Sequence, residues 1–111
     1  MAWLLREGEV LASLEIARSR RERSRGLLGR EGIEGALLLP ATRSVHTVGM
    51  RFPIDVAFCE GDGDLVVVRV VRMNRWRISR PSLRARMVIE AEAGAFARWN
   101  LRPGDRLEVK E

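Results

Sequence analysis

Three polar side chains could act together in acid–base chemistry or in ligand binding. His46 is the single histidine, Asp55 follows it by nine positions, and Glu90 stands in a later apolar run. An imidazole can take up or release a proton near neutral pH, and a carboxylate can orient it. These residues therefore predict one of three things: a small-ligand site, a small hydrolase that uses His46 with Asp55 or Glu90, or a structural junction between strands.

Both acids need a partner if they are buried. An ionised carboxylate that leaves water alone is costly, and a guanidinium can bind it through two parallel hydrogen bonds. The arginines expected to supply that partner are Arg25, Arg30 and Arg51. The result is either a pocket for a small polar ligand or a set of ion pairs that holds a helix on a sheet. The predicted polar centre consists of Arg25, His46, Met50, Arg51, Asp55 and Glu90.

The segment from Arg72 to Arg86 forms a second candidate site because it is strongly basic and contains no acidic residue. The chain carries a formal net charge of +5, and basic surfaces attract nucleic acid or acidic proteins. Two observations weigh against nucleic acid. Arginine provides nearly all of the positive charge, as GC-rich codons alone would produce, and with no tyrosine and only 5% aromatic residues the chain offers few stacking groups. The predicted basic surface consists of Arg72, Arg75, Trp76, Arg77 and Arg80.

No metal or cofactor is expected. The single histidine and the single cysteine, Cys59, match no zinc-ligand spacing, and the acidic turn at 61–64 is too short for a calcium loop. One cysteine excludes an internal disulfide, and no apolar run approaches the roughly 18 residues of a membrane-spanning helix. With no recognisable secretory signal at its start, the chain is expected to be cytoplasmic, and to be a ligand-binding accessory domain rather than an enzyme.

Hydrophobic patterning predicts a chain built from short strands. The strands are expected at 3–6, 10–17, 35–40, 54–60, 65–71, 86–91 and 106–110, and residues 44–48 are expected to be a short strand or an extended segment. The strongest local signal is an antiparallel hairpin of Ile54–Glu60 with Leu65–Val71 across Asp62-Gly63.

Two short helices complete the predicted elements. The capping-box spacing of Ser19 and Glu22 predicts a helix from about Arg20 to Leu28, and residues 94–100 are expected to form one or two helical turns. Together these elements predict a mainly β (α+β) single domain over residues 1–111, folded as a small antiparallel barrel or sandwich.

Four stretches in order along the chain resemble the boxes of one known family. Arg25-Gly26-Leu27-Leu28-Gly29-Arg30 resembles the first box, and Val45 to Val56 resembles the family signature, with its histidine, hydroxyl residue, Met-Arg pair and later Ile-Asp. Val88 to Gly94 and Arg102 to Asp105 resemble the third box and the terminal Gly-Asp turn. The family is the prokaryotic domain-of-unknown-function family 192 (DUF192). The resemblance implies a compact β-rich single domain, and it implies no particular activity.

Overall fold

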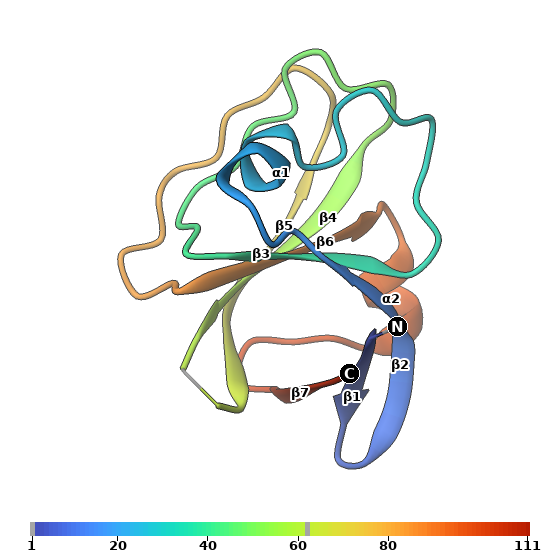
Figure 1. Ribbon diagram of the computed structural model, residues 1–111, viewed down its shortest axis with the longest axis vertical. Coiled ribbons are helices and arrows are strands. Elements are labelled where there is room, and N and C mark those ends of the chain that lie inside the picture. Colours follow the sequence, from blue (N-terminus) through green and yellow to red (C-terminus); the bar gives the residue numbers. More distant parts are fainter. Residues whose placement is uncertain (1, 62) are drawn as a thin grey trace.

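In the computed structural model, which describes residues 2–61 and 63–111, seven strands form a closed barrel in the order β1-β2-β3-β6-β4-β5-β7 (Figure 1). Neighbouring strands are antiparallel except for the parallel pair β2–β3. The predicted mainly β barrel with short helices is therefore confirmed. The elements are β1 (Ala2–Arg6), β2 (Glu9–Ile16), α1 (Arg20–Arg25), β3 (Ala36–Pro40), β4 (Ile54–Glu60), β5 (Leu65–Met73), β6 (Met87–Glu92), α2 (Ala95–Trp99) and β7 (Arg106–Lys110).

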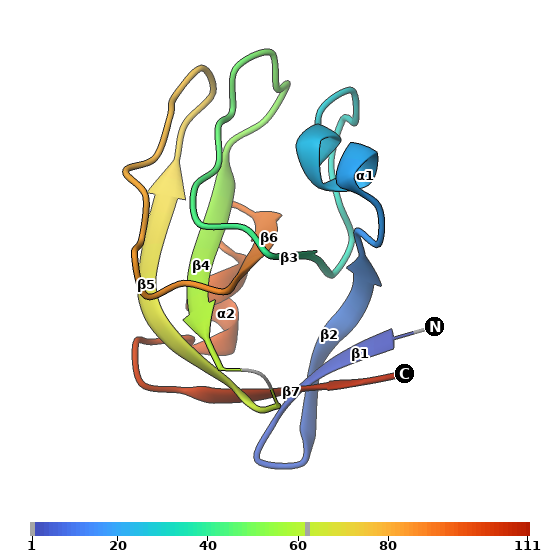
Figure 2. The same cartoon turned by 60° about the vertical axis from the view of Figure 1, so that its left-hand side comes forward.

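The apolar side chains form two cores, one on each face of the sheet. Alternate residues of a strand point to opposite faces, so a strand that is buried on both sides serves both cores. β4 shows this most clearly: Ala57 packs inside the barrel, whereas Val56 and Phe58 pack outside it. The outer core lies beneath the α1 region and the β3–β4 and β5–β6 connections, which extend from the same end of the barrel (Figure 2).

The predicted hairpin is confirmed, because β4 and β5 pair antiparallel along their whole length. Its expected turn includes Asp62, which lies outside the described residues. Of the two alternatives for residues 44–48, the extended segment is the one present, and no named strand forms there. It forms an isolated bridge between His46 and Ile78, and both backbone and side-chain hydrogen bonds join it to the segment 74–79.

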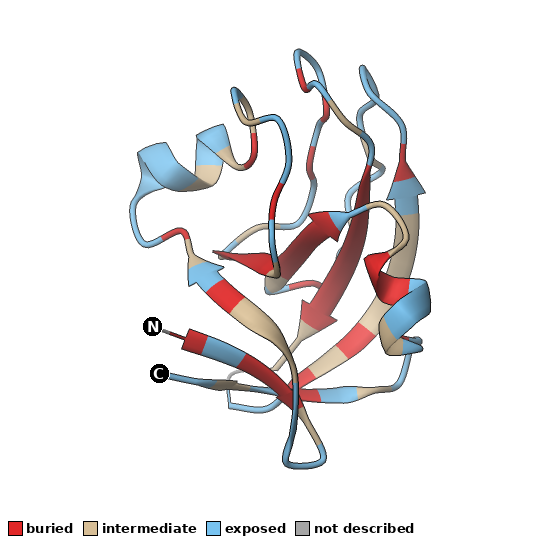
Figure 3. Cartoon of the chain, turned by 90° about the vertical axis from the view of Figure 1, so that its right-hand side faces the viewer, coloured by how far each residue is buried: buried red, intermediate tan, exposed pale blue. Residues whose placement is uncertain are grey.

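Helix α1 begins where the capping box predicts and ends earlier than expected. The Ser19 hydroxyl accepts a hydrogen bond from the Glu22 N–H, and the Glu22 carboxylate accepts one from the Ser19 N–H. Gly26 ends the helix with φ of 51°, a conformation that favours glycine. None of the six helical residues is buried, as Figure 3 shows, and the first buried side chain is Leu27. No helix in the described ranges is long and apolar enough to cross a membrane.

Helix α2 is capped from a distant strand. Its N-cap residue, Gly94, has no side chain to accept the first N–H groups, and Asp55 of β4 takes that role. The Asp55 Oδ2 atom accepts hydrogen bonds from the N–H groups of Gly94 (2.9 Å) and Phe96 (3.1 Å), and Oδ1 accepts one from Arg72 Nε (3.2 Å). A carboxylate at a helix start satisfies otherwise unpaired donors, so Asp55 holds α2 on the barrel.

Replacing Asp55 by Asn should destabilise the fold by about 2–4 kcal/mol, because the carboxylate is 4% exposed and three donors lose a charged acceptor. Urea unfolding followed by circular dichroism measures this difference. The matched variant is Arg72→Gln. It should cost about 1 kcal/mol or less, since the Arg72 side chain is 58% exposed. Equal stability of Asp55→Asn and the parent chain would show that α2 does not depend on Asp55.

Candidate functional site

The two buried acids of the predicted polar centre lie on opposite faces of the sheet. In the β4–β6 ladder Val56 stands opposite Glu90, and Asp55 stands opposite Ala91. Residues directly opposite each other point to the same face, so Glu90 projects outward with Val56, whereas Asp55 projects toward the inside of the barrel. Glu90 lies within β6, which corresponds to the strand expected at 86–91. The expected single polar centre therefore divides into two parts.

The arginines expected to pair with these acids bind elsewhere. Arg51 pairs with Glu31 at 3.2 Å, and Arg30 pairs with Glu15 at 2.7 Å, both on the surface. Asp55 is buried and does have an arginine partner, but that partner is Arg72, which was expected on the basic surface. The reason is register, because the β4–β5 ladder places Arg72 directly opposite Asp55.

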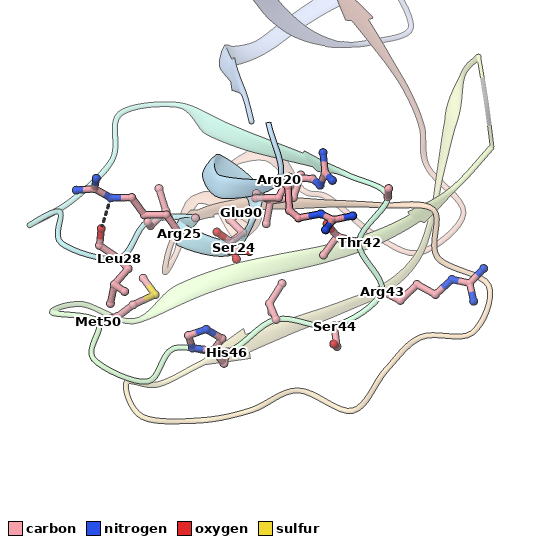
Figure 4. Close-up of a pocket in the computed structure, with 16 residues that line it drawn as sticks. Arg20, Ser24, Arg25, Leu28, Thr42, Arg43, Ser44, His46, Met50 and Glu90 are labelled. Carbon is pink, nitrogen blue, oxygen red and sulfur yellow. Dashed lines mark hydrogen bonds between the residues drawn. The ribbon is translucent and has the colours of Figure 1, made fainter. Parts of the chain in front are cut away.

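The remaining members of the polar centre line one cavity of about 430 Å³, which we call the α1 pocket (Figure 4). It lies between the α1 region and the segment that follows β3, with Glu90 coming from β6. The residues of the predicted centre that it contains are Arg25, His46, Met50 and Glu90. Its other lining residues are Arg20, Arg23, Ser24, Gly26, Leu27, Leu28, Leu39, Ala41, Thr42, Arg43, Ser44 and Val45.

The lining of the α1 pocket combines buried apolar groups with basic side chains. Leu27, Leu39 and Met50 are buried and give it an apolar floor. Arg20 and Arg23 come from α1, and Arg43 comes from the facing segment. These three arginines were not predicted. A three-residue spacing puts Arg20 and Arg23 on one helix face, but the cavity beside that face depends on the tertiary fold.

Arg25 contributes less to the α1 pocket than the sequence suggested. Its Nε atom donates a hydrogen bond to the Leu28 carbonyl oxygen at 3.3 Å. Figure 4 shows the guanidinium turned toward this carbonyl, away from Thr42 and Ser44. The basic character of the pocket therefore depends on Arg20, Arg23 and Arg43.

Glu90 is the one acid among the described residues that line the α1 pocket. It is 3% exposed, and its Oε1 atom has no hydrogen-bond partner among the described residues. Burial raises the pKa of this carboxyl from about 4.5 to about 7. Gly26 lies against it, since a Cβ there would be 3.3 Å from Oε1. Glu90 is thus an unpartnered buried acid beside a cavity with basic walls.

The predicted basic surface contains a turn that is fixed by Thr47. This residue is fully buried, and its hydroxyl donates to the Asn74 carbonyl oxygen at 2.6 Å and accepts from the Arg77 N–H at 2.9 Å. We call residues 74–78 the Trp76 turn. Thr47 was not among the predicted site residues, because a threonine in an extended segment gives no sign of burial. Arg72 of the predicted basic surface pairs with Asp55 at 3.2 Å, and its side chain is 58% exposed.

Cys59 does not form a reactive site. Its side chain is fully buried in the barrel core, and burial raises the pKa of its thiol to about 12. Within 2–61 and 63–111, no group of three or more histidine, cysteine or acidic side chains is placed to hold a metal ion.

Comparison with known proteins identifies a family and a fold. The family model of DUF192, described as "Uncharacterized ACR", matches residues 3–109. The chain is similar to a solved protein of unknown function from Novosphingobium aromaticivorans, with 20% identity and a TM-score of 0.75 over 96% of this chain and 82% of that chain. It is also similar to a Sinorhizobium meliloti protein described as a "putative transcription regulator", with 24% identity and a TM-score of 0.76 over 97% and 91%. No curated protein matches the sequence.

The raised pKa of Glu90 predicts a pH-dependent gain in stability for Glu90→Gln. Between pH 4.5 and about 7 the unfolded chain releases a proton that the folded chain retains, so the parent chain loses up to about 3 kcal/mol across this window. The glutamine variant has no proton to lose. Its Tm advantage over the parent should therefore be smallest below pH 4.5 and reach its full value above pH 7.

Thermal melts of both proteins across this pH range test the prediction. Glu92→Gln is the matched control, because Glu92 is an exposed acid on the same strand. A Tm difference between Glu90→Gln and the parent that stays constant with pH would show that Glu90 is not a destabilising buried acid.

Proposed function

This chain belongs to the uncharacterised DUF192 family, and we propose that the domain binds a small anionic ligand in the α1 pocket. The observation that carries the proposal is the unpartnered carboxyl of Glu90 beside a cavity with arginines on two sides. A buried acid without a partner lowers stability, so its presence beside an open pocket favours a binding role over a purely structural one. A ligand with a hydroxyl or amino group offers Glu90 the missing hydrogen-bond donor.

The arginines define the other end of the ligand. Arg20 and Arg23 face the pocket from α1, and Arg43 comes from the opposite wall. Guanidinium groups bind phosphate and carboxylate through paired hydrogen bonds, so the ligand carries such a group toward these side chains. A cavity of about 430 Å³ is within the usual range for small-molecule sites. A phosphorylated or carboxylated sugar has this combination of anionic group, hydroxyl donors and size.

Binding without catalysis fits the position of His46. This side chain is exposed at the edge of the pocket, and among the described residues no hydrogen bond joins it to Asp55 or Glu90. Asp55 is turned to the other face of the sheet, where its oxygens are already occupied. An acid–base pair of histidine and carboxylate, which a hydrolase would need, is therefore not supported by the geometry.

Thermal shift measurements with four probes test the proposal: a hexose phosphate, a hexuronate, a neutral hexose and inorganic phosphate. The two anionic sugars should raise Tm by several degrees at saturating concentration, because ligand at 100 times its Kd stabilises by about 2.7 kcal/mol. The neutral hexose should have no effect, and inorganic phosphate should give a smaller shift than the hexose phosphate.

Two variants of the same helix locate the binding. Arg20→Ser combined with Arg23→Ser should abolish the shift, whereas Arg21→Ser should retain it, since Arg21 is exposed on α1 but does not line the pocket. The proposal is wrong if no anionic sugar raises Tm, or if the double variant responds as strongly as the parent chain.

A further inference from the structure

Trp76 occupies a backbone conformation that suits other residues better. Its φ angle is +63°, in the left-handed region, where a bulky side chain is strained and glycine or asparagine is tolerated. Its side chain is 61% exposed, so the strain is not offset by deep burial. For folding alone, glycine or asparagine would serve this position better. A strained and displayed aromatic residue therefore points to a role in binding.

The Trp76 turn is held in place by several hydrogen bonds to one buried residue, Thr47. Both polar groups of the Thr47 backbone bind the turn. The Thr47 N–H donates to the Arg77 carbonyl oxygen at 2.7 Å, and the Thr47 carbonyl oxygen accepts from the Trp76 N–H at 3.0 Å. The Thr47 hydroxyl adds bonds to Asn74 and Arg77. A side chain on such a turn loses little freedom when a partner binds.

The charge around the turn selects an anionic partner. Arg75, Arg77 and Arg80 are exposed and form no ion pair within residues 2–61 and 63–111. The acids that neighbour this segment are already paired, since Asp55 binds Arg72 and Glu60 binds Arg84. The turn thus presents an indole between two uncompensated guanidinium groups.

Two more apolar side chains are exposed on the segments that Thr47 joins. Ile78 is 77% exposed and Val48 is 38% exposed, and both lie on the two segments that Thr47 joins. Exposed aliphatic and aromatic groups on one basic surface suit a partner that has flat apolar faces and negatively charged groups at its edge. Unpaired nucleobases on a phosphate backbone have this character. A duplex would keep its bases away from the indole, and an acidic peptide would bind the arginines but give the strained tryptophan no role.

We propose that the Trp76 turn binds single-stranded nucleic acid, with one base stacked on Trp76 and phosphates held by Arg75, Arg77 and Arg80. The site is separate from the α1 pocket, because none of these four residues lines it. Few aromatic residues argue for a short contact of one or two bases rather than an extended stacking platform.

Fluorescence anisotropy with a labelled oligothymidylate of about ten nucleotides tests the stacking contact. Trp76→Asn should weaken binding at least about fivefold, because base stacking on an aromatic side chain contributes on the order of 1–3 kcal/mol. Its Tm should equal or exceed that of the parent, since asparagine tolerates the left-handed backbone. Trp76→Phe should retain most of the affinity. Leu83→Asn, which removes another highly exposed apolar side chain of the basic segment, should leave binding unchanged.

The arginines are tested by salt dependence. Replacing Arg75, Arg77 and Arg80 by Ser should reduce the slope of log K against log salt by about 2, because each phosphate contact with a single strand contributes about 0.7. The Tm of this triple variant should be unchanged, since its three side chains form no ion pair in the described part of the chain.

Three results would overturn the proposal. The first is binding of a duplex as tightly as the oligothymidylate, with no effect of Trp76→Asn, which would reduce the surface to a general attraction for phosphate. The second is binding of polyglutamate but not of the oligothymidylate, which would assign the surface to an acidic protein. The third is the absence of any binding at low salt. In each case, a thermal shift with hexose phosphate that persists in Trp76→Asn would show that ligand binding in the α1 pocket does not depend on the Trp76 turn.

Discussion

The pairing of β4 with β6 sends the two carboxylates that are buried in the described part of the chain to opposite faces of one sheet. Asp55 stands opposite Ala91, and Glu90 stands opposite Val56. A shift of one residue in this ladder would turn every side chain of one strand to the opposite face. The apolar residues that this strand contributes to the two cores would then point away from them. The same register that packs Ala57 inside and Phe58 outside therefore places one acid under α2 and the other beside the α1 pocket.

The two acids have opposite effects on stability. Asp55 accepts hydrogen bonds from three donors. It joins α2 to the barrel wall and pairs with Arg72 of the neighbouring strand β5. Glu90 has an oxygen without a partner, and the helix above it packs no buried side chain against it, so a cavity stays open there. A hydrophobic residue at this position would complete the outer core more stably. The chain thus places an acid and several arginines around a cavity where packing alone would favour apolar groups, as binding sites commonly do.

Much of the fold could be predicted from the sequence because its signals are local. The β4–β5 hairpin and the capping box of α1 depend on residues that are close in the chain, and both are present. The site could be predicted only in part. Burial of Asp55 with an arginine followed from its place in an apolar strand, but the choice of Arg72 depends on strand register. Arg43 and Thr47 gain their positions from long connections that no periodic pattern describes.

The central claim is that Glu90 is a buried acid without a partner beside an open pocket, and a carbon-13 NMR titration of the glutamate side-chain carboxyls measures this directly. We expect one resonance to titrate with a pKa of about 7 and to be missing from Glu90→Gln. If no glutamate resonance titrates near pH 7, Glu90 is solvated or already paired, and the case for a ligand site in the α1 pocket is contradicted.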